Sequence, residues 1–229
     1  MTAVPDMVVL TGDLTETGAA SEWAELTDRI ESLAVPWHAI AGNHDQAVAE
    51  LAGHRCVAAG PLRLVLLDTS SEEFTPDDAA WLTSQLEMSD QPTVVAMHHP
   101  PFETGIWWMD CAGMSGSERF EHVVRSHPCV IKVICGHVHR VIQTQWDGCS
   151  LWTSPSTANA VAVDFDPAHG PAETAEPPAF SLHAYTGSSI VSHVVPVGAS
   201  ATRTLIEANA PEFVSWARSK NETRPTQFG

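Results

Sequence analysis

Basic side chains are scarce in this chain. Lys and Arg together number 11 among 229 residues, against 28 Asp and Glu, so the formal net charge is −17. Nucleic-acid backbones and anionic membrane surfaces are bound through clustered Lys and Arg. The composition therefore argues against both kinds of partner. It is compatible with a small anionic substrate, because a bound cation can reverse the local field of an acidic protein.

The sequence also lacks a long apolar run and a cysteine framework. Its most apolar stretches, such as residues 64–67 and 129–135, fall far short of the roughly 20 residues that a membrane helix needs. The five cysteines form no Cys-x-x-Cys pair, and no signal-peptide pattern opens the chain. We therefore expect a cytoplasmic protein that builds its core without disulfides.

Apolar runs and helical patterns alternate over the first 139 residues. A short buried strand that runs into a Gly-Asp turn is expected within residues 5–13, and further buried strands are expected at 37–41, 62–68, 93–97 and 130–135. Helices are expected at residues 21–34, 75–86 and 118–126, the second with Thr75 as N-cap and Pro76 at its first position.

The sequence pattern changes after His139. Short alternating runs predict antiparallel strands at residues 141–146, 150–153, 160–165, 179–185 and 190–195, with a loop at 166–178. The whole pattern predicts a layered α/β sandwich of two packed sheets with outer helices. We expect one domain over residues 1–199 and a weakly helical tail over 200–229.

Four polar clusters follow the ends of predicted strands. They are Gly12-Asp13, Gly42-Asn43-His44-Asp45, His98-His99 and His137-Val138-His139. Ligands bind at the carboxyl edge of an open α/β sheet, where residues distant in sequence converge. Asp, Asn and His are ligands suited to Fe, Mn, Zn or Co. A single cluster of this kind would be explained as an ordinary polar turn. Four of them, each after a predicted strand, predict a metal site.

The same clusters, with Pro100-Pro101 and Gly136 beside them, resemble four of the five signature blocks of the calcineurin-like metallophosphoesterase superfamily. The likeness spans residues 5–197. Residues 10–16 and 177–180 most resemble its class III cyclic nucleotide phosphodiesterase branch. The resemblance implies a four-layer α/β/β/α sandwich of two packed mixed sheets. It also implies hydrolysis of phosphodiesters, in particular 3',5'- or 2',3'-cyclic nucleotides.

The resemblance assigns the metal ligands of a centre that holds two divalent or Fe/Mn-type ions. Asp13 would bridge both ions. Asn43, His98 and His137 would complete the second ion, and His139 would belong to the first. The attacking group would be a metal-bound hydroxide, because bound cations lower the pKa of water.

The resemblance also implies the catalytic residues. His44 would stabilise the phosphoryl charge and protonate the leaving alkoxide, and Asp45 would orient His44. His99 can face the substrate, but it is expected rather to be structural or to support the ligands. The adjacent Trp107 and Trp108 either stack on a nucleobase or cover the rim of the core.

One signature block is absent. The family opens with Asp-x-His, which occurs nowhere in these 229 residues. The first ion keeps only Asp13 and His139, too few for a tight site. We expect a first strand and helix to be missing, through a misplaced start or a truncation, in preference to a real loss. The chain as written is then expected to bind about one ion and, with apolar sheet surface uncovered, to dimerise or aggregate.

Two other readings are left open by the sequence. A broad phosphomonoesterase or glycerophosphodiesterase would share the same ligands, because loops around the groove choose the substrate. A degenerate relative would bind a nucleotide or one metal without turnover. The absent Asp-x-His favours the second of these readings, whereas the intact His44 and Asp45 oppose it.

Overall fold

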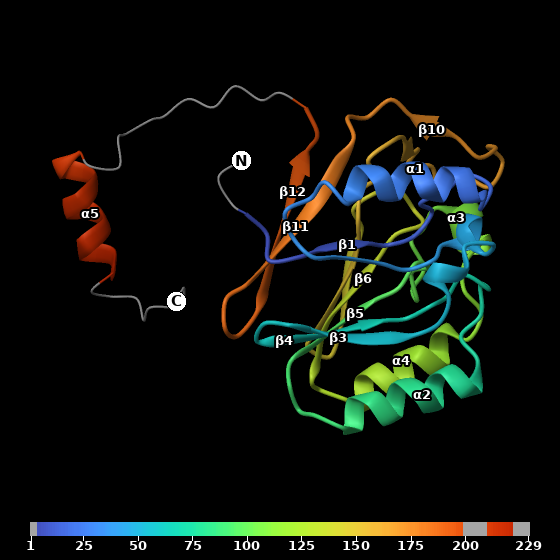
Figure 1. Ribbon diagram of the computed structural model, residues 1–229, viewed down its shortest axis with the longest axis horizontal. Coiled ribbons are helices and arrows are strands. Elements are labelled where there is room, and N and C mark those ends of the chain that lie inside the picture. The colour runs from blue at the N-terminus through green and yellow to red at the C-terminus, as the bar shows by residue number, and fades with distance from the viewer. Residues whose placement is uncertain (1–3, 199–209, 222–229) are drawn as a thin grey trace.

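The centre of the fold is a mixed sheet of six strands (Figure 1). The computed structural model describes residues 4–198 and 210–221. In spatial order the strands are β3 (Arg55–Ala59), β4 (Leu62–Leu66), β5 (Thr93–Ala96), β6 (Val130–Cys135), β8 (Cys149–Thr153) and β7 (Gln143–Trp146). The four middle strands run parallel, and β3 and β7 are antiparallel edges. The carboxyl ends of β4, β5 and β6 therefore meet at one edge.

Two helices cover one face of this sheet. Leu82 of α2 (Pro76–Glu87) and Phe120 of α4 (Ser117–Ser126) are fully buried in one cluster with the inward side chains of β4, β5, β6 and β8. The start of α2 confirms the prediction, since Thr75 Oγ1 accepts from the Asp78 N–H at 3.1 Å.

Two separate strand pairs cover the opposite face. The pairs are parallel β1 (Val8–Leu10) with β2 (Trp37–Ala39), and antiparallel β11 (Ala179–Tyr185) with β12 (Ile190–Pro196). Val9 and Ile190 pack on the same cluster of the central sheet, and α1 (Ala20–Ile30) covers β1 and β2 through Trp23. Figure 1 shows α1 on one side of the layers and α2 with α4 on the other. The predicted layered α/β architecture is confirmed.

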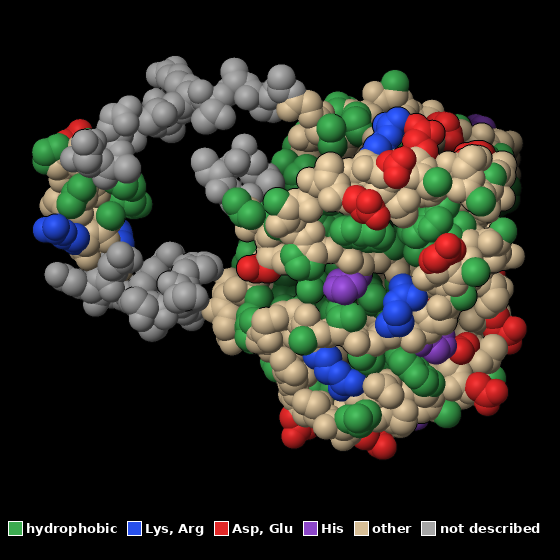
Figure 2. Space-filling view, viewed as in Figure 1, with side chains coloured by type: hydrophobic (Ala, Val, Ile, Leu, Met, Phe, Trp, Pro, Cys, Tyr) green, Lys and Arg blue, Asp and Glu red, His purple; other side chains and the backbone are tan. Residues whose placement is uncertain are grey.

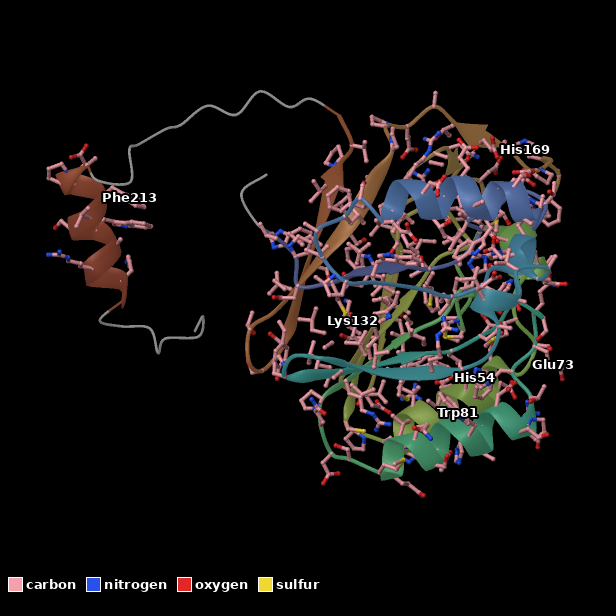
Figure 3. All side chains as sticks on the ribbon, in the orientation of Figure 1. His54, Glu73, Trp81, Lys132, His169 and Phe213 are labelled. Atoms are coloured by element: carbon pink, nitrogen blue, oxygen red, sulfur yellow. The ribbon has the colours of Figure 1, made fainter. Side chains whose placement is uncertain are left out.

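The second layer is divided into two strand pairs. Among the described residues, β1 pairs only with β2 and β11 only with β12. Lys132 of β6 lies buried inside the body (Figure 3), with its Nζ 5.1 Å from the centre of the Trp152 ring. Trp152 Nε1 donates to Ser181 Oγ of β11 at 2.8 Å. Side-chain contacts rather than a backbone ladder therefore hold the hairpin on the central sheet.

The strand-rich half confirms the expected antiparallel pairing, in β7 with β8 and in β11 with β12, and adds one parallel pair. In the sheet β8 lies between β6 and β7, although β7 precedes it in the chain. It pairs parallel to β6 and antiparallel to β7. The run at 160–165 shortens to β9 (Ala160–Val161), which pairs with β10 (Glu173–Thr174) inside the expected loop. The sequence did not predict β3 or the short helix α3 (Trp107–Cys111).

The tail is described in part. It contains the helix α5 (Pro211–Asn221), while residues 199–209 and 222–229 lie outside the described residues. The proposed domain boundary near residue 199 stays a prediction.

The surface agrees with the acidic composition. On the globular body in Figure 2 the Lys and Arg side chains are few and separated from one another. This face therefore presents no extended basic patch of the kind that binds a phosphate backbone. Within residues 4–198 and 210–221 no helix has the length and apolarity needed to cross a membrane.

Candidate metal centre

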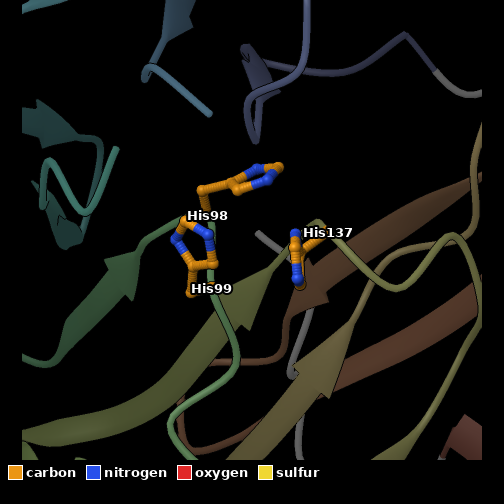
Figure 4. A group of neighbouring side chains, drawn as sticks. All are labelled: His98, His99 and His137. Atoms are coloured by element: carbon orange, nitrogen blue, oxygen red, sulfur yellow. The ribbon is translucent and has the colours of Figure 1, made fainter. Parts of the chain in front are cut away.

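The loops that follow β1, β2, β5 and β6 bring most of the predicted ligands together. Asp13 Oδ2 lies 3.2 Å from His98 Nε2, and His98 and His137 have ring centroids 5.1 Å apart. Asn43 opens a short 3-10 helix, Asn43–Asp45, whose His44 N–H donates to Asp13 Oδ1 at 3.1 Å. Figure 4 shows His98 and His99 at the end of one strand facing His137 at the end of the next. These placements match the convergence expected from the strand ends.

Three predicted ligands adopt the left-handed backbone conformation. The φ angles are 53° at Asp13, 66° at His137 and 51° at His139. This region disfavours residues with a Cβ, and such strain clusters at functional sites. Gly12 and Gly42 leave the room that the turns need, since a Cβ at Gly42 would lie 2.2 Å from Asp13 Oδ1. The loop backbone is therefore shaped around the positions of the ligand side chains.

Five buried side-chain atoms of the described residues have no hydrogen-bond partner. They are Asn43 Oδ1, His98 Nε2, His99 Nε2, His137 Nε2 and His139 Nδ1. Buried polar atoms are normally paired, and an unpaired group costs about 1–3 kcal/mol. All five belong to the predicted clusters. Each is an amide oxygen or an imidazole nitrogen, and both kinds of atom can bind a transition metal. The residues present therefore fit a bound metal.

The Asp13 and His98 pair shows the need for a cation most directly. His98 Nδ1 lies 2.7 Å from the Thr11 carbonyl oxygen, which can only accept, so Nδ1 carries a proton. In the neutral ring, Nε2 then turns a lone pair toward the Asp13 carboxylate. Two lone-pair atoms 3.2 Å apart repel unless a proton or a metal ion shares them. This geometry is that of a metal-ligand pair.

Burial favours the uncharged form of three histidines of the centre, His99, His137 and His139. It lowers the pKa of His137 to about 4 and that of His99 to about 3, with neighbouring histidines adding to the effect, and it also lowers the pKa of His139. Burial by itself would raise the pKa of Asp13, but a proton shared with His98 Nε2 and the hydrogen bond from the His44 N–H hold the pKa of this carboxyl well below its usual range. Neutral imidazoles and an ionised carboxylate are the forms that bind metal.

His44 differs from the other histidines of the centre. Its side chain is exposed, and its Nδ1 donates to the Glu16 carbonyl at 2.9 Å. That hydrogen bond outweighs partial burial and, with the charges of Asp13, Glu16 and Asp45, raises the pKa of His44 above its ordinary value. The ring therefore holds a proton closer to neutral pH than a free histidine does, with Nε2 as its free end.

Asp45 does not make the contact with the His44 ring that the sequence led us to expect. Its fully buried carboxylate accepts from the N–H groups of Leu14, Thr15 and Gly42 at 2.8–3.0 Å and from Thr15 Oγ1 at 2.7 Å. Backbone N–H groups of both loops point at this carboxylate, so it joins the loop of Asp13 to the loop of Asn43. These hydrogen bonds indicate that Asp45 fixes the two loops, whereas its role in orienting His44 stays a prediction.

Two residues beyond the predicted set belong to the centre. His99, expected to be structural, has its ring centroid 4.5 Å from that of His137. His98, His99 and His137 form the one group of at least three His, Cys, Asp or Glu side chains in the described ranges whose ligand atoms all lie within 4.8 Å of one another. Thr69, fully buried after β4, binds both His98 and His99 through its hydroxyl. Its place after a predicted strand was the signal that could have identified it.

The two sides of the centre differ in exposure. His98 and His99 are fully buried. His139, the ligand expected for the first ion, instead lines a pocket with Arg140, Asn159 and Glu176. His139 therefore borders this pocket, whereas His98 and His99 do not. Trp108 packs beside Val138, which favours covering of the core rim over stacking on a nucleobase.

Three comparisons relate this chain to known proteins. The model of the family "Calcineurin-like phosphoesterase" matches residues 3–141. A "probable glycerophosphodiester phosphodiesterase GpdQ" of Arcobacter nitrofigilis is 30% identical over 215 residues, which are 85% of this chain and 79% of the relative. A probable cyclic nucleotide phosphodiesterase of a Synechococcus species is 32% identical over 181 residues, 73% of this chain and 69% of the relative.

The fold has a counterpart among solved structures. A dimetal phosphatase from Danio rerio superposes with a TM-score of 0.55, covering 84% of each chain at 15% sequence identity. The family match covers more than half of this chain and agrees with the layered fold and the strand-end ligands. The chain belongs to the calcineurin-like phosphoesterase family of metal-dependent phosphoester hydrolases.

Proposed function

We propose that this chain is a phosphodiesterase whose substrates are 3',5'- or 2',3'-cyclic nucleotides. The observation that carries the proposal is a set of five buried side-chain atoms without a hydrogen-bond partner, all on the loops that follow β2, β5 and β6. Relatives named as cyclic nucleotide phosphodiesterases support the substrate class. The acidic surface agrees with a small anionic substrate held by bound cations rather than by Lys and Arg.

The chain's own residues divide between two metal positions. Asn43, His98 and His137 would hold one ion together with Asp13. Asp13 and His139 alone would hold the other, so we expect about one tightly bound ion in the chain as written. Bound divalent ions supply positive charge for the phosphoryl oxygens and acidify a coordinated water.

His44 would act as the general acid. The ring is exposed, carries its Nδ1 proton toward Glu16, and has a raised pKa. Its Nε2 end would deliver a proton to the leaving oxygen of the substrate while the neighbouring Asn43 holds metal. Asp45 would keep both loops in register and so keep His44 beside the metal.

The decisive experiment compares two leaving groups. His44→Ala should lower turnover of a cyclic nucleotide by about 10²- to 10⁴-fold, the range typical of a lost general acid. The loss should be smaller for an aryl phosphodiester, because a phenolate leaves without a proton. His193→Ala, on exposed β12, is the matched control and should change neither rate. Equal losses on both substrates would show that His44 only stabilises phosphoryl charge, and loss of metal would show that it is a ligand.

Metal content tests the ligand assignment separately. Elemental analysis of protein purified without chelator should give about one divalent ion per chain. Asp13→Ala should lose the ion together with activity, because Asp13 serves both positions. Two tightly held ions, or none, in the unaltered protein would contradict the assignment.

Glycerophosphodiesters are the second candidate substrate class. The specific observation in their favour is the GpdQ-named relative, 30% identical over 85% of this chain. Values of kcat/KM for 3',5'-cyclic AMP, 2',3'-cyclic AMP and glycerophosphocholine would decide between the classes. Nucleotide binding without hydrolysis of any of the three would instead identify a non-catalytic relative.

A further inference from the structure

The hydroxyl of Thr69 has three hydrogen-bonding neighbours at the base of the centre. The backbone N–H groups of His98 and His99 each lie 3.3 Å from Thr69 Oγ1. His99 Nδ1 lies 3.2 Å from the same oxygen. All three contacts are buried, and Thr69 itself is fully buried. The hydroxyl therefore has no solvent to satisfy it and must distribute its hydrogen bonds among these three groups.

A count of donors and acceptors fixes the direction of each bond. A hydroxyl accepts two hydrogen bonds and donates one. The two backbone N–H groups can only donate, so they occupy both acceptor positions of Thr69 Oγ1. The hydroxyl proton is then directed to His99 Nδ1. Since Nδ1 accepts, a neutral His99 carries its single proton on Nε2.

The opposite tautomer leaves the site unsatisfied. If His99 Nδ1 carried the proton, three donors would point at one oxygen with two acceptor positions. The Thr69 proton would also have no acceptor in a buried site, and such unpaired groups are rare and costly. The hydrogen-bond geometry therefore favours the Nε2–H form.

His98 and His99 consequently present opposite groups to the same space. His98 donates from Nδ1 to the Thr11 carbonyl, so its Nε2 offers a lone pair. His99 offers an N–H at Nε2, which is buried and has no protein partner. His98, His99 and His137 each contribute one ring nitrogen to a group whose atoms all lie within 4.8 Å of one another (Figure 4). A lone pair suits a cation, whereas an N–H suits an anionic oxygen.

We propose that His99 is not a metal ligand but donates a hydrogen bond from Nε2 to an anionic phosphoryl oxygen held at the centre. Thr69 is the positioning residue that sets this tautomer. The inference rests on the proposed phosphodiesterase function, since it names the group that recognises the phosphoryl oxygen. It gives the adjacent histidines His98 and His99 different tasks.

The tautomer is read directly in the metal-free protein. Long-range 1H–15N correlation spectra of protein labelled with 15N-histidine should show His99 protonated at Nε2 above pH 6. Thr69→Val removes the O–H donor at nearly constant shape and should shift His99 toward the Nδ1–H form. Thr69→Ser keeps the hydroxyl and should restore the Nε2–H form. An Nδ1–H tautomer in the unaltered protein would overturn the inference.

Metal and anion binding provide the second readout. His99→Leu in Mn²⁺-loaded protein should keep the metal content of the unaltered protein while weakening the binding of inorganic phosphate by about 10- to 100-fold, the effect of a lost hydrogen bond to a charged group. His99→Gln places an amide N–H near the same position and should recover part of that loss. His183→Leu, a largely buried histidine on β11 outside the centre, is the matched control and should change neither quantity.

The outcomes separate this inference from the function on which it rests. Loss of metal in both His99 variants would identify His99 as a ligand and overturn the inference. Unchanged phosphate affinity in His99→Leu would overturn it as well. If the unaltered protein bound neither metal nor phosphate, the proposed function would fail, whereas the spectra of the metal-free protein would still decide the tautomer.

Discussion

Replacing Asp45 by Asn tests the most densely bonded carboxylate of the centre. Its two oxygens accept from four donors: the N–H groups of Leu14, Thr15 and Gly42 and the Thr15 hydroxyl. In Asp45→Asn one oxygen becomes an NH2 group. If Oδ2 is the oxygen replaced, the NH2 group faces the Gly42 N–H, which donates to Oδ2 at 2.9 Å in the unaltered protein. The Leu14 N–H, which is shared between Oδ1 and Oδ2, then keeps only its bond to Oδ1.

The expected loss of stability follows from this count. A buried donor left without a partner costs about 1–3 kcal/mol, and neutral hydrogen bonds are about half as strong as charge-assisted ones. Relief from burying a charge offsets part of the loss. We expect a net decrease of about 3 kcal/mol in the free energy of unfolding. For a domain of this size that corresponds to a decrease of about 6–12 °C in Tm.

The assay is thermal unfolding in the presence of a chelator, followed by metal titration. Without chelator, metal affinity should also fall by about 10- to 100-fold, because the loops of Asp13 and Asn43 are no longer fixed to each other. Asp28→Asn, on the exposed side of α1, is the matched control and should leave both quantities unchanged.

The result also separates the two roles considered for Asp45. If Asp45 acted by orienting His44, the substitution would alter the pH dependence of kcat and leave the stability of the metal-free protein almost unchanged. A stability loss below about 1 kcal/mol with unaltered metal affinity would refute the reasoning from the hydrogen bonds.

Three further predictions follow from packing and charge. Gly42→Ala should abolish metal binding, because its Cβ would lie 2.2 Å from Asp13 Oδ1, whereas Gly170→Ala meets nothing within 4 Å and should retain it; elemental analysis of both variants is the check. Burial, and then the charge of Lys132, lower the pKa of His183 to about 4. Between pH 6.5 and 4 the unfolded chain therefore binds a proton that the folded chain does not, and stability falls as pH falls. In urea titrations His183→Gln should reduce this slope by up to about 1.4 kcal/mol per pH unit, and an unchanged slope would show that the ring is solvated. The hairpin β11–β12 pairs with no other strand in the described part of the chain. Light scattering should therefore find a dimer or larger species, and a stable monomer would contradict this prediction.

The sequence by itself determined the layered fold and the candidate ligands. The fold and the ligands were both predicted from local patterns: apolar runs of strand length, a capped helix at Thr75, and polar residues directly after strands. Parallel strands bring their carboxyl ends to one edge whatever the details of packing. The convergence of His98 and His137, which follow neighbouring parallel strands, was therefore predictable from the sequence. Asp13 follows β1 of the separate β1–β2 pair, so its place beside them depends on how the two layers pack.

The tertiary structure decided what depends on partners distant in the chain. Asp45 bonds to backbone groups 30 or 31 residues away, so no local pattern showed that it fixes two loops rather than one ring. The tautomer of His99 depends on a hydroxyl at Thr69, 30 residues earlier. The insertion of β8 between β6 and β7 depends on backbone pairing, which apolar alternation leaves undetermined. Hydrogen-bond direction and strand order depend on which groups lie next to each other in space. Only the folded chain determines those neighbours.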